Sequence, residues 1–97
     1  MKSVKNPKYL KWIRSQECCV TQTPAFGFTD IVCHHINMKS YGLRGIGSKV
    51  SDYRVVPMTA IEHTRLHHVG ERSYWQEVDI DPFQISLDLL IAYLDQK

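Results

Sequence analysis

The sequence predicts a small α+β domain in which two short antiparallel strands pack against a helix. Two stretches rich in β-branched and apolar residues, 29–36 and 53–56, have the composition of strands. A long glycine-bearing connection, 37–51, separates them. The string Thr59-Ala60-Ile61-Glu62 follows, and a threonine with a glutamate three residues later is a capping box that begins a helix. We expect this helix to end near Gly70.

Further helices are expected on both sides of this core, which covers about 29–70 of a single domain, 1–97. Asn6-Pro7 combines an N-cap residue with a proline at the first helical position and predicts a helix over about 7–15. A short helical piece is expected around 73–78, and Asp81-Pro82 begins a last helix over about 82–95. The apolar residues expected to share one face of the last helix are Phe83, Leu87, Leu90, Ile91 and Leu94.

The composition narrows the class of protein. Hydrophobic residues make up 43% and charged residues 23% of the 97 residues, which is typical of a folded domain and argues against disorder. Apolar runs are far shorter than the ~20 residues of a membrane helix, and residues 1–5 do not resemble a secretory signal. The odd number of cysteines, 3, with Cys18 next to Cys19, makes a poor disulfide framework. We therefore expect a cytoplasmic protein with no membrane partner.

Positive charge is concentrated in the first three quarters of the chain. Residues 1–72 contain eleven Lys or Arg and five Asp or Glu, whereas residues 73–97 contain one Lys and five acids. Such asymmetry suits an anionic partner that contacts one face. Lys5, Lys8, Lys11 and Arg14 recur every three residues along the predicted first helix. This basic stripe has two interpretations that the sequence leaves open, a solvated helix face and a set of phosphate contacts.

The histidines carry the chemical argument. All 5 lie between residues 34 and 68. Neighbours on a strand point to opposite faces, so His34 and His35 cannot perform the same task, whereas His63 and His67 are four residues apart and share one face of a helix. His63 and His67 from the helix and one imidazole from the strand predict a three-nitrogen metal site, with positions left open for water or substrate.

Several strings together resemble the HNH (ββα-metal) nuclease superfamily, in particular small phage and prophage nucleases linked to recombination. The strings are Val32-Cys33-His34-His35-Ile36, Lys49-Val50-Ser51-Asp52-Tyr53, Val56-Pro57-Met58, Glu62-His63 with His67, Tyr74-Trp75, and Asp79-Ile80-Asp81-Pro82-Phe83. The resemblance spans residues 12–90. It implies a ββα-metal core: a two-stranded antiparallel hairpin packed on a helix, with flanking helices.

The resemblance also implies a function. The implied protein is a metal-dependent DNA endonuclease of low sequence specificity. It hydrolyses phosphodiester bonds with one metal ion and a histidine general base, His35. The implied cofactor is one divalent ion held by His34, His63 and His67. It is zinc, nickel, manganese or magnesium, of which imidazole ligands favour the softer ions. DNA is the implied partner, with a recombination protein as a further one, in the host cytoplasm if the chain is phage-encoded. Candidate phosphate contacts are Lys39, Arg44, Lys49 and Arg65.

The chain departs from this family at two places. Related nucleases often carry two Cys-x-x-Cys pairs that bind a structural zinc, but here Cys18 is followed by Thr21, and Thr59 and Glu62 occupy the second pair. We therefore expect no such zinc. The loop asparagine that orients the general base is not evident, and Asp52 lies near its place. Asp52 is a candidate catalytic residue, with a turn residue or an ion-pair partner of a nearby Lys or Arg as alternatives.

A non-catalytic, metal-stabilised DNA-binding module is the alternative function. It would use the same fold to hold a metal and to grip DNA through its basic face. His35 distinguishes the two, because a purely structural metal site has no need of a second strand histidine on the opposite face. A protease is disfavoured, since no acidic general base accompanies the histidine pair in the manner of His-Glu-x-x-His.

Overall fold

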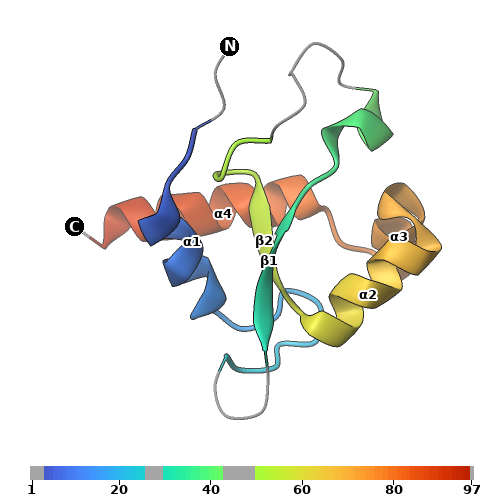
Figure 1. Cartoon of the computed structure of the whole chain (residues 1–97), viewed down its shortest axis with the longest axis horizontal. Helices are drawn as coiled ribbons and strands as arrows, with labels where there is room; N and C mark the ends of the chain where they lie inside the picture. The colour runs from blue at the N-terminus through green and yellow to red at the C-terminus, as the bar shows by residue number, and fades with distance from the viewer. Residues whose placement is uncertain (1–3, 26–29, 43–49, 97) are drawn as a thin grey trace.

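The computed structural model describes residues 4–25, 30–42 and 50–96. The elements in chain order are α1 (Pro7–Arg14), β1 (Ile31–His35), the 3-10 helix η1 (Met38–Tyr41), β2 (Val55–Thr59), α2 (Ala60–Val69), α3 (Glu71–Val78) and α4 (Pro82–Asp95). Within the described residues the fold is therefore α+β, with a two-stranded antiparallel sheet and four α-helices, and it is compatible with the predicted ββα arrangement. Figure 1 places α1 on one side of the strands, α2 and α3 on the other, and α4 across the back.

The first helix forms where the sequence predicts it. The side chain of Asn6 accepts a hydrogen bond from the Tyr9 N–H at 3.0 Å and so caps the helix, and Pro7 occupies its first position. Tyr9 and Ile13, one turn apart, are fully buried. Lys8, Lys11 and Arg14 are exposed on the other side of the helix.

The second strand spans Val55–Thr59, whereas the sequence predicts a strand over 53–56 that ends before Pro57. The register pairs Cys33 with Pro57, and the flanking bonds from Ile36 N–H to Arg54 C=O and from Ala60 N–H to Asp30 C=O place this pair at a position without cross-strand hydrogen bonds. An N–H at residue 57 would point away from β1, so the proline costs the sheet no hydrogen bond between the strands. Its carbonyl, which points outward too, accepts the Cys19 N–H at 2.9 Å.

A single glycine separates the next two helices. The hydroxyl of Thr59 accepts the Glu62 N–H at 3.3 Å, as the predicted capping box requires, and α2 ends before Gly70 as expected. Gly70 has a φ of 103°, a conformation that favours glycine, and its carbonyl accepts the Tyr74 N–H at 2.9 Å. The third helix therefore begins at Glu71, two residues before the predicted piece at 73–78.

The sheet has a hydrophobic cluster on each face. One cluster contains Val56 and Met58 packed with Leu66 of α2 and with Tyr74 and Trp75 of α3. On the other face, the buried residues of the second cluster are Tyr9, Ile13 and Val55, with residues of α4 packed against them. Because neighbours along a strand alternate, His34 faces the first cluster and His35 the second.

The last helix spans the predicted residues but presents a different face to the core. Leu87, Ile91 and Leu94 of the expected apolar face are 50%, 48% and 51% exposed. Leu90 of the expected face does pack against the second cluster, and Ile85, Leu89 and Tyr93 of the adjacent face supply the other apolar contacts of the helix with the core. The reason is that α4 crosses behind the sheet in contact with both α1 and β2, and the side chains that meet these two elements are the ones that are buried. No helix in the described part of the chain is long and apolar enough to cross a lipid bilayer.

Candidate functional site

The sheet and the second helix bring three imidazoles together. His34 comes from β1, and His63 and His67 come from successive turns of α2. One ring nitrogen of each lies within 4.8 Å of the others, so the three side chains could hold a metal ion. Between His63 and His67 the Nε2 atoms are 3.1 Å apart, close to the ~3.3 Å that two nitrogens show when they bind one tetrahedral ion at ~2.0–2.1 Å.

A buried carboxylate fixes the strand histidine of this cluster. The Nε2 of His34 lies 2.9 and 3.0 Å from the two carboxylate oxygens of Glu71, and both residues are buried. Glu71 also accepts hydrogen bonds from Trp75 Nε1 and from the Asn37 N–H. The carboxylate can only accept, so Nε2 of His34 carries the proton and Nδ1 is the nitrogen available to a metal ion. Metal-binding histidines are commonly oriented by a carboxylate in this way.

The charges around the cluster favour ionised Glu71 and a neutral imidazole at His63. Burial opposes ionisation of Glu71, but the hydrogen bonds from His34, Trp75 and Asn37 outweigh it and place its pKa below the usual value. Burial, followed by the neighbouring His34 and His67, lowers the pKa of His63. A neutral imidazole is the form that binds a metal, so His63 keeps its ligand form to lower pH than an exposed histidine.

The other strand histidine contacts a different carboxylate. His35 Nε2 lies 3.0 Å from Asp52 Oδ1, and Asp52 is only 3% exposed. The second oxygen of Asp52 accepts the Asn6 N–H at 2.7 Å, so the start of α1 holds the carboxylate in place. Burial raises the pKa of Asp52, but the hydrogen bonds from His35 and Asn6 more than offset this and its pKa is lowered overall. An ionised Asp52 accepts the Nε2–H of His35 and leaves Nδ1 with its lone pair.

The three-imidazole cluster and His35 open into one cleft of about 720 Å³ between β1, η1, α2 and the start of α3. Its lining includes His34, His35, His63 and His67, together with Lys39, which is exposed on η1. The structure thus brings Lys39 to the histidines. Arg44 and Lys49, two further predicted phosphate contacts, lie outside the described residues.

Arg65 is placed differently from Lys39. It is not among the residues that line the cleft. Its guanidinium lies 2.7 Å from Glu77 and 3.3 Å from Glu62, and it stacks over the ring of Tyr74 at 5.4 Å. These contacts join α2 to α3 and compete with a phosphate for the same side chain. A phosphate contact by Arg65 stays a prediction.

Sequence reasoning missed two residues of this site. Glu71 was not singled out, although a glutamate four residues before a tryptophan places both on one helix face, where Trp75 Nε1 can donate to the carboxylate. Asn6 was expected only to cap α1, and its N–H also anchors Asp52 across 46 residues of sequence. Nothing local in the sequence indicates that second contact.

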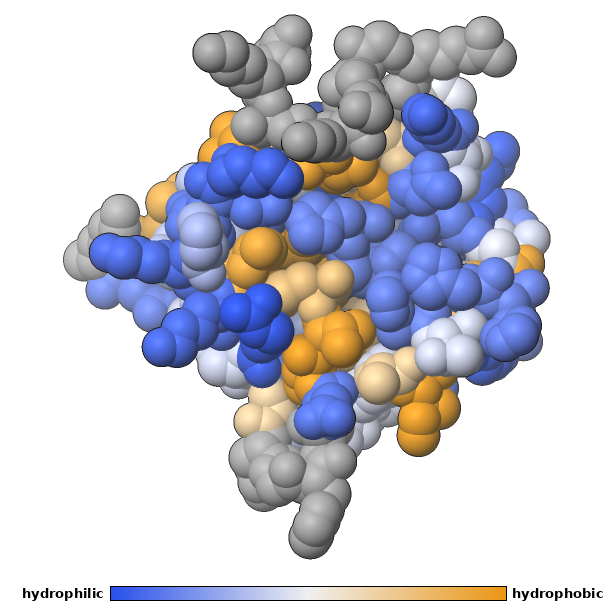
Figure 2. Space-filling model, in the orientation of Figure 1, coloured by the Kyte–Doolittle hydropathy of each residue, from blue (hydrophilic) through white to orange (hydrophobic). Residues whose placement is uncertain are grey.

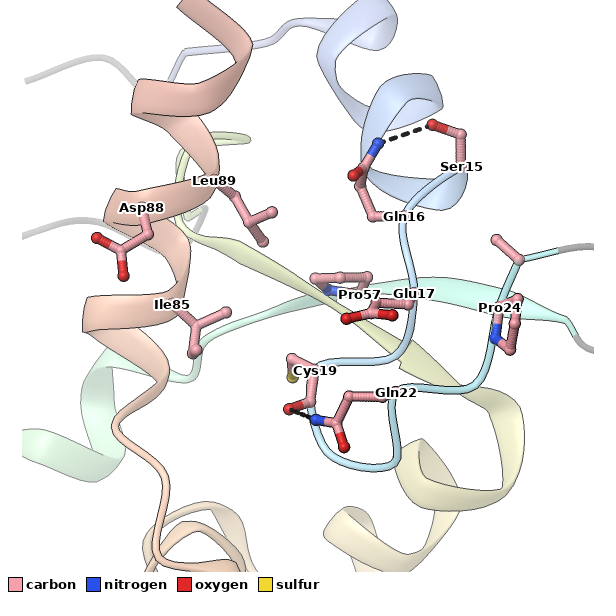
Figure 3. Close-up of a pocket in the computed structure, with 11 residues that line it drawn as sticks. Ser15, Gln16, Glu17, Cys19, Gln22, Pro24, Pro57, Ile85, Asp88 and Leu89 are labelled. Carbon is pink, nitrogen blue, oxygen red and sulfur yellow. Dashed lines mark hydrogen bonds between the residues drawn. The ribbon is translucent and has the colours of Figure 1, made fainter.

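A second hollow lies between α4 and the segment that follows α1 (Figure 3). It has a volume of about 620 Å³, and Pro57, Ile85 and Leu89 line it together with polar side chains such as Gln16 and Gln22. In Figure 3 the α4 side chains lie across the hollow from those of residues 15–24. Its lining contains no histidine. The histidine cleft is therefore the candidate functional site.

The sequence comparisons place the chain in a family. The family model DUF968, described as "Protein of unknown function", matches residues 1–88. The chain belongs to the DUF968 family. All four histidines of the cleft, and both of their carboxylate partners, lie inside the segment that DUF968 matches. Neither the comparison with curated proteins nor that with solved structures gives a match.

Proposed function

We propose that this DUF968 chain is a metal-dependent DNA endonuclease of the HNH type, which hydrolyses phosphodiester bonds with one metal ion and a histidine general base. One observation carries the proposal. Three imidazoles from β1 and α2 converge at a cleft, and a fourth, His35, lines the same cleft and is hydrogen-bonded to a buried aspartate. A set of imidazoles able to hold a metal ion, beside a histidine that is hydrogen-bonded to a carboxylate, matches what phosphodiester hydrolysis requires.

The donor set at the cleft fits a divalent metal ion. His34, His63 and His67 would hold the ion, and three protein nitrogens leave coordination positions open for substrate. When bound, such an ion neutralises negative charge on the phosphate and on the departing oxygen. Glu71 orients His34 toward it. An all-imidazole set favours zinc, nickel, cobalt or manganese over magnesium in affinity.

His35 is the proposed general base. Asp52 accepts its Nε2–H, so the free lone pair of Nδ1 can take a proton from the attacking water. Asp52 acts here as a positioning residue that fixes the ring and its tautomer, and Asn6 holds Asp52 in turn. Lys39 at the cleft rim would contact a phosphate without reading the base sequence.

The alternative, a non-catalytic metal-stabilised DNA-binding module, accounts for His34, His63 and His67 but gives His35 and Asp52 no role. A buried, ionised aspartate placed against a histidine that is 36% exposed is a costly arrangement for a purely structural module. The geometry therefore favours the enzyme.

The decisive experiment incubates supercoiled plasmid with metal-free protein and individual divalent ions. We expect wild-type protein to nick or cut the plasmid with at least one ion. His35→Ala should lower the rate by about 10²–10⁴, the usual effect of removing a general base, while metal binding measured by calorimetry is retained. His68→Ala is the matched control, because His68 is exposed on α2 outside the cleft lining and its loss should leave the rate unchanged.

Two results would contradict the proposal. If wild-type protein binds both metal and DNA yet cuts with none of the ions, the non-catalytic module is the correct function. If pure His35→Ala protein cuts at the wild-type rate, His35 is not the general base.

A further inference from the structure

The outward face of α1 carries only positive charge. Lys8, Lys11 and Arg14 are exposed. With 100° of rotation per residue, they lie on the side of the helix opposite the buried Tyr9 and Ile13. Residues 1–16 contain no aspartate or glutamate. The ion pairs found among the described residues involve His34, His35 and Arg65, and none involves a cation of α1. The outward face of Lys8, Lys11 and Arg14 is called the α1 basic face below.

Helix stability does not explain this face. Lys11 and Arg14 lie in the last turn, where a cation interacts favourably with the helix dipole. Lys8 is the second residue of the helix, where the dipole disfavours a cation, and the first turn contains no acid. A solvated helix face commonly mixes both signs of charge. The uniform charge therefore indicates an anionic partner.

The α1 basic face adjoins the histidine cleft on the side of His35. At its start, α1 is joined to Asp52, the partner of His35, through the Asn6 N–H at 2.7 Å. Toward its end, Arg14 Nη1 lies 3.8 Å from the Sγ of Cys33, and that Sγ lies 3.4 Å from the Leu10 carbonyl. Cys33 precedes His34 on β1 and lines the cleft. Figure 2 shows hydrophilic side chains over both α1 and α2 on one face, with an apolar band over the strands between them.

We infer that the α1 basic face binds the phosphate backbone of a DNA duplex whose scissile phosphate lies in the histidine cleft. This inference rests on the proposed function and extends its substrate surface beyond the cleft. The helix is ~12 Å long at ~1.5 Å per residue, and duplex DNA rises ~3.4 Å per base pair. The α1 basic face is therefore long enough to contact a few consecutive phosphates of one strand. Contacts of lysine and arginine with phosphates position DNA without reading its sequence.

The aromatic residues favour a duplex over a single strand. Single-strand binding surfaces present exposed aromatic rings on which bases stack. In the described part of the chain, the rings nearest the α1 basic face pack on each other, with Tyr9 in contact with Trp12, Tyr53 and Tyr93. Tyr9 is fully buried and the other three rings are partly buried against its cluster, so their faces are engaged in packing rather than presented to a base.

A membrane surface fits less well. Amphipathic helices that bind lipid insert apolar side chains between the headgroups. Apart from Pro7, the apolar residues of α1 are buried or half-buried, and the large side chains on its outward face are charged.

The test compares two double variants of equal net charge. Lys8→Gln/Lys11→Gln removes two cations from the α1 basic face. The control, Ser73→Glu/Gln84→Glu, adds two anions at exposed third positions of α3 and α4, where the helix dipole offsets the repulsion that the new carboxylates meet from Glu77 and Asp88. Fluorescence anisotropy with chelator present measures binding to a labelled duplex over a range of salt concentrations. Circular dichroism checks that each variant is folded.

We expect Lys8→Gln/Lys11→Gln to weaken duplex binding and to lower the slope of log affinity against log salt by about 2, near 0.9 for each lost phosphate contact. The control should keep nearly the wild-type slope. With metal restored, the lysine variant should still cut plasmid at a saturating concentration of protein, because His35 and the three candidate metal ligands are intact.

Several outcomes would overturn the inference. They are an unchanged slope, equal losses in the two variants, tighter binding of a single strand than of the duplex, and binding of phosphatidylserine vesicles in preference to DNA. If wild-type protein nevertheless cuts plasmid, the proposed function stands while the α1 inference fails. If wild-type protein neither binds nor cuts DNA, both fail.

Discussion

Both carboxylate oxygens of Glu71 lie within hydrogen-bond distance of His34 Nε2, at 2.9 and 3.0 Å. The pair joins the first strand to the first turn of α3 across 37 residues of sequence, inside the protein. It orients the one ligand candidate that does not come from α2. The relationship makes Glu71 a positioning residue for the metal site, and it can be tested without any assay of cleavage.

Glu71→Gln should weaken metal binding while the protein stays folded. Glutamine keeps the size of the side chain but loses the charge that favours protonated Nε2, and loss of such a partner typically lowers metal affinity about 10–100-fold. Calorimetric titration with zinc measures the effect. Glu77→Gln is the control, since Glu77 is exposed on the same helix and pairs with Arg65. Wild-type zinc affinity in folded Glu71→Gln would contradict this role.

His67→Ala should abolish most of the stabilisation that metal gives to the fold. Metal at 100 times its dissociation constant adds about 2.7 kcal/mol to the free energy of unfolding of the wild-type protein, because the site exists only in the native state. His67 is exposed, so its truncation should cost little in the metal-free protein. Thermal unfolding with and without zinc, beside His68→Ala, gives the comparison. An equal zinc-induced rise in Tm for wild type and His67→Ala would remove His67 from the site.

Asp52 should make the stability of the metal-free protein depend on acid pH. Its pKa is lowered in the folded state, because hydrogen bonds from His35 and Asn6 outweigh burial, while an unfolded aspartate titrates near ~3.9. The folded state therefore binds the proton less well. The stabilisation is present above the unfolded pKa and is lost as pH falls through the folded pKa.

Asp52→Asn tests this dependence. Urea unfolding between pH 6 and pH 3 should show a smaller loss of stability for the variant than for wild type. Glu71, whose pKa is also lowered, remains in both proteins and contributes equally. Parallel pH profiles for the two proteins would mean that Asp52 has the same pKa folded and unfolded.

Chelation should leave most of the helix content in place. The two hydrophobic clusters on the faces of the sheet are formed by side chains alone. Cys18 is buried beside Thr21 in the segment where the resemblance to HNH nucleases would place a structural zinc, and a threonine hydroxyl does not replace a thiolate ligand. Far-ultraviolet circular dichroism before and after chelation measures the change. Collapse of the helical signal, or two tightly bound zinc ions per chain, would show a structural zinc after all.

The limits of local sequence signals are clear at Pro57. Proline lacks the N–H that a strand needs at every second position, so the sequence placed the strand end there. Pro57 lies instead inside the strand, opposite Cys33, at a position where the two strands form no hydrogen bonds with each other. Which positions bond across a sheet depends on the register with the partner strand, and the sequence of one strand does not contain that register.

The sequence alone determined where α1 and α2 begin, where α2 ends, and on which faces the histidines lie. Asn6 and Thr59 cap helices, and Gly70 ends one, through contacts within four residues of each position. Alternation along β1 separates His34 from His35, and the helical period joins His63 to His67. These effects are local, so they can be read from the chain before it folds.

Only the tertiary structure decided what surrounds those histidines. Glu71 reaches His34, and Asp52 reaches His35, across 37 and 17 residues of sequence. The choice of which face α4 buries, leaving Leu87 half exposed, is likewise made by its crossing over α1 and β2. Propensity and periodicity describe one segment at a time, whereas a buried carboxylate finds its partner only when packing excludes water and leaves the imidazole as the available donor.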